Sequence, residues 1–300
     1  MQEIVLKTQS LTKRYGKTTA VDDVSLTINR GDIYGFIGNN GAGKTTFMRC
    51  VLGLARPDCG KIELFPSESG TAERKRRKIG SLIEAPGIFG DCSAKENLLR
   101  FGKLTSCSPA EADDLLELVG LSNVGNKKAG KFSLGMKQRL GIAVALLGNP
   151  EFMVLDEPIN GLDPEGIKEI RELILRLNRE KNVTFLISSH MLAELNKVAT
   201  KFGIISHGRL AQEISAAEVE SLSENGLEFC VSDGTAATAI LKEKFPSFAV
   251  KSDSGVLSVS APSEFAAKIN SALVTGGVEV SRVVEKKSET ERFFLERMGK

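Results

Sequence analysis

The pattern of apolar and polar positions divides the first two thirds of the chain into short strands and longer helices. Apolar runs of strand length are bounded by glycine and other turn residues, and they alternate with stretches in which apolar residues recur every three to four positions. Strands that alternate with helices are typical of a doubly wound α/β fold with a mostly parallel sheet. The predicted strands cover residues 4–6, 20–28, 33–37, 152–155 and 183–188, with a hairpin formed by 202–206 and 209–212.

Capping residues mark the starts of several helices. Ser93 and Ser108 are each followed three positions later by glutamate, which is the capping-box pattern, and Pro109 suits the first position of a helix. A helix that begins at Lys44 is expected to end at Gly53, because glycine is favoured just past a helix C-terminus. Two further helices are predicted, from the stretch KFSLGMKQR to about residue 147 and from Asp163-Pro164 to about residue 181.

A second, smaller unit is predicted after about residue 215, where the composition shifts toward Ser, Ala, Glu and Gly. Its expected order of strand, helix, strand, strand, helix, strand is typical of a ferredoxin-like α+β unit. We therefore expect a main domain at 1–215 with a helical subdomain at about 85–149, a linker at 216–226, and an accessory domain at 227–300. The predicted strands of the accessory domain cover 227–231, 248–251, 256–261 and 278–284. Its predicted helices cover 235–244 and 264–275, and a last helix begins at Glu289.

Composition and charge narrow the class of protein. The 40 basic and 38 acidic side chains leave a net charge of +2, which gives no reason to expect nucleic acid as a partner. The longest apolar stretches, such as 142–147, are far shorter than the roughly 20 residues that cross a bilayer, and the first ten residues lack a secretory signal. The five cysteines show no CxxC spacing, so we expect reduced thiols. These features predict a cytoplasmic location.

A glycine-rich stretch, GNNGAGKTT, joins a predicted strand to a predicted helix and satisfies the G-x-x-x-x-G-K-[ST] pattern. Its glycines allow a tight turn, so that backbone N–H groups and the helix N-terminus face phosphate oxygens. Lys44 is expected to reach the terminal phosphates and the Thr45 hydroxyl to ligate magnesium, which makes ATP and Mg²⁺ the expected cofactors. The nucleotide-binding residues expected here are Gly38, Asn39, Asn40, Gly41, Ala42, Gly43, Lys44, Thr45 and Thr46.

Polar side chains follow two other apolar strands at the carboxyl edge of the expected sheet, where open α/β sheets bind ligands. Asp156 would hold the magnesium shell, and Glu157 would orient or deprotonate the attacking water. His190, after the run ISS, would contact the γ-phosphate or that water, unless it is simply packed or solvated. Tyr15 is the candidate for stacking on adenine, with packing in a turn as the alternative. The basic run at 74–78 is expected to be a solvated helix face rather than a contact for nucleic acid or anionic lipid.

The chain resembles the ATP-binding subunits of ABC transporters over about residues 3–215. The resemblance rests on Tyr15, GNNGAGKT, SLGMK, FMVLDE, the N-G-L-D stretch at 160–163 and ISSH, which occur in the family's order. It implies a P-loop NTPase core with antiparallel β and helical subdomains, and an ATPase coupled to transport. It makes Tyr15 the adenine-stacking residue, Asp156 the magnesium carboxylate, Glu157 the catalytic base and His190 the γ-phosphate sensor, and it places Asp163 in the subunit-communication loop.

The same resemblance gives KFSLGMKQR a role. In this family the signature, most often LSGGQ, binds the γ-phosphate of the nucleotide held by the opposite subunit. The resemblance therefore implies that Ser133, Gly135 and Met136 contact ATP in trans, and we expect a homodimer. Leu134 and Met136 replace small residues of the usual pattern, which leaves Ser133 and Gly135 as the main phosphate contacts.

Glu84 stands where most family members carry a glutamine that touches magnesium and senses the membrane partner. A carboxylate can still ligate magnesium, but it adds negative charge beside the triphosphate. Together with SLGMKQRLGIA, this substitution resembles the subgroup that exports bacitracin and lantibiotics. We therefore expect an ATPase at the inner face of the cell membrane that drives a separate transmembrane permease. The alternative is a soluble ATPase switch acting on the ribosome or nucleic acid, which predicts paired nucleotide domains or a long coiled coil that the sequence does not show.

Overall fold

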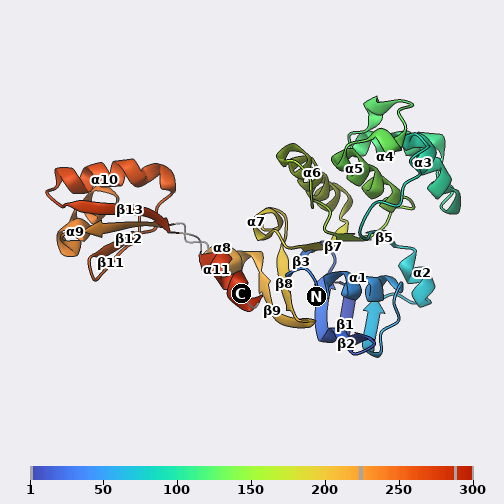
Figure 1. The fold of residues 1–300 in the computed structure, drawn as a ribbon, viewed down its shortest axis with the longest axis horizontal. Helices are drawn as coiled ribbons and strands as arrows, with labels where there is room; N and C mark the ends of the chain where they lie inside the picture. Colours follow the sequence, from blue (N-terminus) through green and yellow to red (C-terminus); the bar gives the residue numbers. More distant parts are fainter. Residues whose placement is uncertain (1–2, 223–225, 287–288, 299–300) are drawn as a thin grey trace. The chain divides into compact units, whose positions relative to one another are not determined.

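The computed structural model describes residues 3–222, 226–286 and 289–298, which form two compact units (Figure 1). The first unit takes in the chain up to Ala216 together with the residues from Arg297 onward, and the second runs from Ala217 to Glu296. The sequence assigned the end of the chain to the small domain, whereas Arg297 and Met298 lie with the large one.

A six-stranded sheet forms the centre of the first unit. Five of its strands are parallel, and the last pairs antiparallel with its neighbour in the predicted hairpin. The middle strands β6, β7 and β3 are buried at every position, as expected for parallel strands covered on both faces. The strands in sheet order are β5 (Ile79–Leu82), β6 (Phe152–Asp156), β7 (Thr184–Ser189), β3 (Ile33–Ile37), β8 (Lys201–Ser206) and β9 (Arg209–Ser215).

The strand register brings three motifs to one edge of this sheet. Asp156 pairs with Ser188, and Ile37 pairs with Ser189, so β6, β3 and β7 end side by side. The segments that follow these strands begin with Gly38, Glu157 and His190. The phosphate loop and both candidate catalytic residues are therefore adjacent because of the register, although they are far apart in the sequence.

An antiparallel three-stranded sheet packs on the central sheet. Its order is β2-β1-β4, and both of its strand pairs contain bulges. One apolar cluster joins this sheet to β3 and α1 through residues such as Val5, Leu26, Phe36 and Phe47. The strands are β1 (Ile4–Tyr15), β2 (Thr18–Asn29) and β4 (Cys59–Leu64), and the helix is α1 (Lys44–Leu52).

The helical subdomain contains α3 (Ala94–Phe101), α4 (Pro109–Leu118) and α5 (Leu134–Ala145), which lie together in Figure 1. Both predicted capping boxes are present, with Ser93 and Ser108 as the capping residues. Arg139 of α5 donates to the carbonyls of Val119 and Gly120 at 3.2 and 3.1 Å, which satisfies acceptors at the C-terminal end of α4.

The remaining helices of the first unit connect or extend these layers. Arg176 of the long helix α6 donates to the Leu118 carbonyl, so α6 also holds the end of α4. These helices are α2 (Ala72–Arg76), α6 (Pro164–Lys181) and α7 (Leu192–Leu195). Within the described part of the chain, no helix combines the length and the apolar character that a bilayer crossing requires.

The second unit is a four-stranded antiparallel sheet with order β11-β12-β10-β13. This is the order of a ferredoxin-like βαββαβ unit, in which the first and third strands occupy the centre. The inward face of the sheet packs against two helices through Leu227, Phe229, Leu257, Leu241 and Ile269. The elements are α8 (Ala216–Leu222), β10 (Gly226–Val231), α9 (Gly234–Lys244), β11 (Val250–Asp253), β12 (Val256–Val259), α10 (Ala266–Thr275), β13 (Val280–Lys286) and α11 (Glu289–Arg297).

The sequence missed several short elements. β4, β5, α2, α7 and α8 were not predicted, and β1 is much longer than the expected strand at 4–6. The expected linker at 216–226 contains α8 in its described part. All five cysteines are free, as expected.

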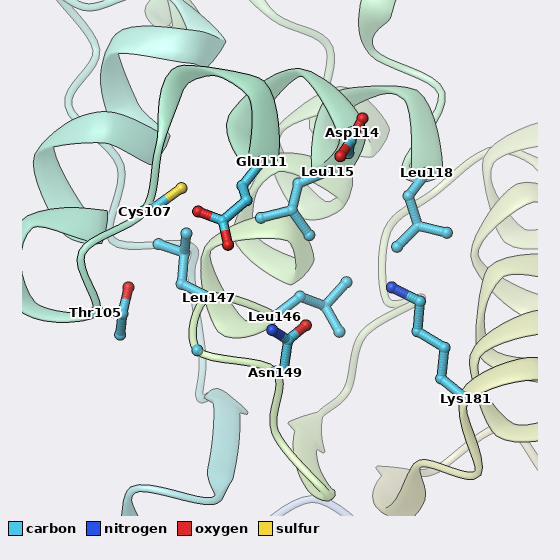
Figure 2. A pocket seen from close by; sticks show the side chains of 11 residues that line it. Thr105, Cys107, Glu111, Asp114, Leu115, Leu118, Leu146, Leu147, Asn149 and Lys181 are labelled. Carbon is cyan, nitrogen blue, oxygen red and sulfur yellow. The ribbon is translucent and has the colours of Figure 1, made fainter.

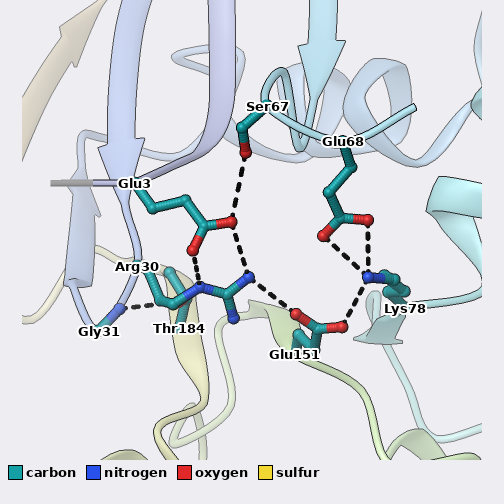
Figure 3. Close-up of polar contacts among 8 residues, drawn as sticks. All are labelled: Glu3, Arg30, Gly31, Ser67, Glu68, Lys78, Glu151 and Thr184. Atoms are coloured by element: carbon teal, nitrogen blue, oxygen red, sulfur yellow. Dashed lines mark hydrogen bonds and ion pairs between the residues drawn. The ribbon is translucent and has the colours of Figure 1, made fainter.

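Five charged side chains of alternating sign form a chain of ion pairs that ties the antiparallel sheet to the central sheet (Figure 3). Arg30 lies 2.7 Å from Glu3 and 2.8 Å from Glu151, and Lys78 lies 2.8 Å from Glu151 and 2.7 Å from Glu68. The basic run at 74–78 thus contributes Lys78 to a structural network.

This network predicts a loss of stability in acid. The Arg30 guanidinium lowers the pKa of Glu3 by hydrogen bonding, and the Lys78 ammonium lowers the pKa of Glu151. A carboxyl group whose pKa is lowered on folding stabilises the fold at pH values above its ordinary pKa. This stabilisation is lost as the pH falls through the lowered pKa. Replacing Arg30 with methionine keeps the apolar stem but removes both ion pairs.

We expect Arg30→Met to melt at a lower temperature than the unmodified protein at pH 7, with the difference shrinking as pH falls through the lowered carboxyl pKa values. Thermal unfolding measured over a pH series checks this result. The exposed Arg179 of α6, changed to methionine, is the matched control. A melting difference that stays constant into acid would show that the ion pairs do not stabilise the fold.

Candidate nucleotide site

The phosphate loop connects β3 to α1, and close packing requires glycine at Gly38 and Gly43. A Cβ on Gly38 would lie 2.4 Å from the Ile205 carbonyl oxygen, and one on Gly43 would lie 2.2 Å from the Ala20 carbonyl oxygen. Gly43 also has a φ of +105°, in the left-handed region that favours glycine. The sequence therefore folds into a narrow loop that opens directly into the N-terminus of α1.

Two neighbouring segments support this loop. The Gly208 amide, in the turn between β8 and β9, donates to the Ala42 carbonyl at 3.0 Å. The Met298 carbonyl accepts hydrogen bonds from Asn39 Nδ2 and Ser206 Oγ, each at 3.2 Å. A cavity of about 200 Å³ opens over the loop and is lined by Ala20, residues 39–46 and Glu157. The structure thus gathers the predicted phosphate-binding residues around one cavity with a carboxylate at its wall.

Lys44 lies at the centre of this cavity wall, with only 6% of its side chain exposed. Its ammonium donates to the carbonyls of Gly38 and Asn39 at 2.6 and 3.3 Å. It also forms an ion pair of 3.1 Å with Glu157 Oε1. A buried ammonium group needs such partners, and an anionic phosphate can replace the carboxylate among them.

Asp156 ends β6 and is held by hydroxyl groups on both sides. Thr45 Oγ1 donates to Asp156 Oδ2 at 2.7 Å, and Ser188 Oγ donates to Asp156 Oδ1 at 2.5 Å. Mg²⁺ prefers oxygen ligands and takes few from the protein, keeping waters and phosphate oxygens for the rest. The hydroxyl of Thr45 beside the carboxylate of Asp156 therefore fits a magnesium site next to the phosphate loop.

Glu157 joins the two remaining candidates. Its Oε2 lies 2.8 Å from His190 Nδ1, while its Oε1 contacts Lys44. Glu157 is 20% exposed and lines the cavity, and its partner His190 is 37% exposed, so both side chains remain open to solvent. A carboxylate in this position can accept a proton from a water molecule that approaches the terminal phosphate.

Tyr15 and Glu84 lie apart from this cluster of contacts. Tyr15 is the last residue of β1. It is 49% exposed, and the Lys13 ammonium lies over its ring, 5.2 Å from the centroid. Glu84 forms an ion pair of 2.6 Å with Arg49 of α1. Among the described residues, no group of three or more His, Cys, Asp or Glu side chains forms a metal cluster, so Glu84 does not gather with Asp156 and another such ligand.

The signature lies at the start of α5 and is capped by its own serine. Ser133 Oγ accepts a hydrogen bond from the Met136 amide at 3.3 Å, and both Ser133 and Leu134 are exposed. A Cβ on Gly161 would lie 3.2 Å from Leu134 Cδ2, so the signature borders the loop that leads to Asp163. Asp163 itself caps α6 by accepting from the Gly166 amide at 3.0 Å.

Within this chain, therefore, Ser133 is exposed, Gly135 and Met136 are half-buried, and none of the three lines the phosphate-loop cavity. Two supporting residues escaped the sequence analysis, namely Ser188 and Gly208. The sequence does place Ser188 in the run ISSH, two positions before His190.

A larger cavity, of about 260 Å³, lies between α4, the end of α5 and the end of α6 (Figure 2). Leucines supply much of its wall, and Glu111, Asp114 and Lys181 supply charged groups. The phosphate-loop cavity is the better candidate because it combines backbone amides at a helix N-terminus, a buried lysine and a general base.

Comparisons with known proteins agree with this reading of the geometry. Residues 21–160 match the family model described as ABC transporter. The chain is 42% identical to the bacitracin transport ATP-binding protein BcrA of Bacillus licheniformis, over 98% of this chain and 97% of the relative. It is 41% identical to the lantibiotic transport ATP-binding protein SrtF of Streptococcus pyogenes, over 73% of this chain and 95% of the relative.

A solved structure shares the fold as well. The ADP conformation of MJ1267, an ATP-binding cassette of an ABC transporter, superposes with a TM-score of 0.63 at 28% identity, covering 73% of this chain and 95% of that chain. These relatives confirm the resemblance inferred from SLGMKQRLGIA and Glu84 to the bacitracin and lantibiotic subgroup. The chain belongs to the ABC transporter family, as an ATP-binding subunit that hydrolyses ATP to power transport.

Proposed function

We propose that two copies of this chain enclose ATP between the phosphate loop of one and the signature of the other, and that hydrolysis drives a separate permease to export peptide antibiotics. The observation that carries the proposal is the position of Glu157, which bridges Lys44 and His190 at the mouth of the phosphate-loop cavity. This arrangement combines a phosphate-binding cation with a general base.

The roles of the individual residues follow from their contacts. The amides of residues 39–46 and the N-terminus of α1 hold the phosphates, and Lys44 exchanges its contact with Glu157 for one with the terminal phosphate. Thr45 and Asp156 would hold Mg²⁺, which would supply positive charge to neutralise the phosphates. Glu157, released from Lys44, accepts the proton of the attacking water.

His190 and Tyr15 complete the proposed site. His190 holds one carboxylate oxygen of Glu157 at 2.8 Å and can also donate toward the terminal phosphate. Tyr15 offers an exposed ring face for adenine, while the Lys13 ammonium occupies the other face. Glu84 is proposed to exchange between its Arg49 partner and the magnesium side of the bound nucleotide.

We place the signature against a second copy because Ser133 is exposed and no signature residue lines the phosphate-loop cavity of its own chain. The N-terminus of α5 carries no acidic residue in its first turn, so the positive helix dipole and the first amides of the helix, apart from the Met136 amide that Ser133 caps, can face an anion. Ser133 and Gly135 lie at this end, and neither lines the phosphate-loop cavity that holds the buried Lys44 and Glu157. We therefore propose that Ser133 and Gly135 complete an ATP site whose phosphate loop lies on the partner subunit.

Replacing Ser133 with aspartate tests this assignment in trans. Aspartate keeps the helix cap but places a negative charge where the partner's phosphate would approach. We expect Ser133→Asp to abolish ATP-driven dimer formation and to lower hydrolysis by at least about tenfold, since 1.4 kcal/mol of repulsion suffices for that factor. ATP affinity of the separate subunit should stay within about twofold of the original.

Light scattering, ATPase assays and nucleotide titrations measure these three quantities. Ser108→Asp is the matched control, because Ser108 caps α4 through the same contact at another helix of the subdomain. A Ser133→Asp protein that dimerises and hydrolyses normally, or one whose separate subunit no longer binds ATP, would contradict the assignment.

The transport partner and its substrate are proposed from the relatives. Proteins named for bacitracin and lantibiotic transport match this chain over most of its length, which supports peptide antibiotics as the exported class and the inner face of the membrane as the location. The test is to co-purify the membrane partner and to express the pair in a sensitive host. Protection against bacitracin or a lantibiotic is expected, and it should disappear with Glu157→Gln.

A further inference from the structure

Ser188 of β7 touches both carboxylate residues of the proposed site. Its side chain is fully buried, and its Oγ lies 2.5 Å from Asp156 Oδ1 and 2.8 Å from the amide nitrogen of Glu157. No other side chain in the described contacts hydrogen-bonds both of these residues. The hydroxyl therefore sits at the junction between the magnesium ligand and the base.

The direction of both hydrogen bonds is fixed by chemistry. A backbone N–H can only donate, so Ser188 Oγ accepts from Glu157. The single hydroxyl hydrogen is then free to donate to Asp156 Oδ1, which is the strong, charge-assisted member of the pair. Since Thr45 donates to the other oxygen, both oxygens of Asp156 are held before nucleotide binds.

The contact with Glu157 has a conformational consequence. Glu157 has a φ of +49°, in the left-handed region that a residue with a Cβ adopts at a cost of about 1–3 kcal/mol. The Ser188 hydroxyl receives the amide of this residue, and the Asn160 amide donates to its carbonyl at 3.1 Å. This backbone conformation directs the side chain toward Lys44 and His190.

We propose that Ser188 is a positioning residue for ATP hydrolysis, which holds Glu157 in its left-handed conformation and orients Asp156 through one shared hydroxyl. The inference rests on the proposed role of Glu157 as the base. Ser188 does not touch the reacting atoms; it acts through the two residues that do.

The same strand offers a matched control. Thr184 at the start of β7 is also fully buried, and its hydroxyl accepts a hydrogen bond from the Gly31 amide at 2.9 Å. Removing either hydroxyl leaves a backbone N–H without its partner, which destabilises the fold. Of the two, only Ser188 hydrogen-bonds to Asp156 and Glu157. A loss of kcat is therefore expected at Ser188 and not at Thr184.

The test compares Ser188→Ala, Ser188→Thr and Thr184→Val in the full chain. We expect Ser188→Ala to lower kcat by about 10- to 100-fold, as small displacements of catalytic groups do, with the KM for ATP within about threefold. Affinity for ATP measured without Mg²⁺ should not change. Ser188→Thr keeps the hydroxyl, and threonine is favoured in a β-strand, so this variant should recover most of the kcat.

Thr184→Val should lower the melting temperature as Ser188→Ala does, yet keep its kcat within about twofold. If Ser188→Ala does not fold, Ser188→Cys replaces it, since a thiol of similar size forms only weak hydrogen bonds and should show the same loss of kcat. A Ser188→Ala protein with a lower melting temperature but an unchanged kcat would overturn the inference about Ser188. If Glu157→Gln still abolishes turnover in that case, the proposed base is unaffected. Full turnover by Glu157→Gln would instead overturn the proposed base itself.

Discussion

Replacing Glu157 with glutamine is expected to lower the rate of ATP hydrolysis by about 10²- to 10⁴-fold, the usual contribution of a general base. Glutamine keeps the size and the hydrogen bond to His190 but cannot accept a proton at neutral pH. It also removes the charge that now pairs with Lys44 at 3.1 Å, so the terminal phosphate has no carboxylate to displace. ATP binding should therefore persist or tighten, and the ATP-bound dimer should accumulate.

Single-turnover hydrolysis and light scattering in the presence of ATP measure the two effects. Glu165→Gln is the control, because Glu165 is an exposed carboxylate in the first turn of α6. Normal turnover by Glu157→Gln would refute the base assignment. Loss of ATP binding would instead show that Glu157 is needed to shape the phosphate loop.

Replacing Lys44 with alanine is expected to weaken ATP binding by about 10- to 100-fold, because one hydrogen bond between charged groups contributes about 1.5–3 kcal/mol. The ammonium is buried, and its donors already point at the Gly38 and Asn39 carbonyls and at Glu157. Without it, Glu157 remains at the cavity without its cation and repels the terminal phosphate.

Isothermal titration with ATP measures the change in affinity. Lys61→Ala, at an exposed lysine of β4, controls for the loss of one positive charge. Lys44→Ala should retain its melting temperature within a few degrees, so that weaker binding cannot be assigned to unfolding. Unchanged affinity would remove Lys44 from the site.

Local signals in the sequence predicted much of the fold and of the site. The capping boxes at Ser93 and Ser108 depend on residues three positions apart, and both form as expected. The phosphate loop was predictable because its glycine spacing reflects the local backbone conformation, and Gly43 indeed has a left-handed φ. Asp156 and Glu157 were predictable as acids at the end of an apolar strand.

The missed features depend on partners distant in the sequence. β4 begins with Cys59-Gly60-Lys61, which lacks an apolar pattern and becomes a strand only through pairing with β1. The role of Ser188 requires the register between β6 and β7, which places it opposite Asp156. The contact of Met298 with Asn39 joins the end of the chain to its beginning, and no local pattern encodes it.

The pairing of Glu84 with Arg49 is a further example. The sequence shows a carboxylate where the family usually has glutamine, and its negative charge would be repelled by the triphosphate. In the structure a guanidinium on α1 neutralises it at 2.6 Å. The substitution therefore has a local partner that only the fold reveals.

The central claim is that each ATP site combines Lys44 of one subunit with Ser133 of the other, and a mixing experiment tests it most directly. Lys44→Ala and Ser133→Asp proteins should each hydrolyse ATP poorly. A mixed dimer, however, contains one site with both an intact phosphate loop and an intact signature. Hydrolysis by an equimolar mixture should therefore recover far above that of either component and reach at most about half of the original rate, since only mixed dimers contain an intact site and each has one of two. A mixture that remains as inactive as its separate components would contradict the composite site.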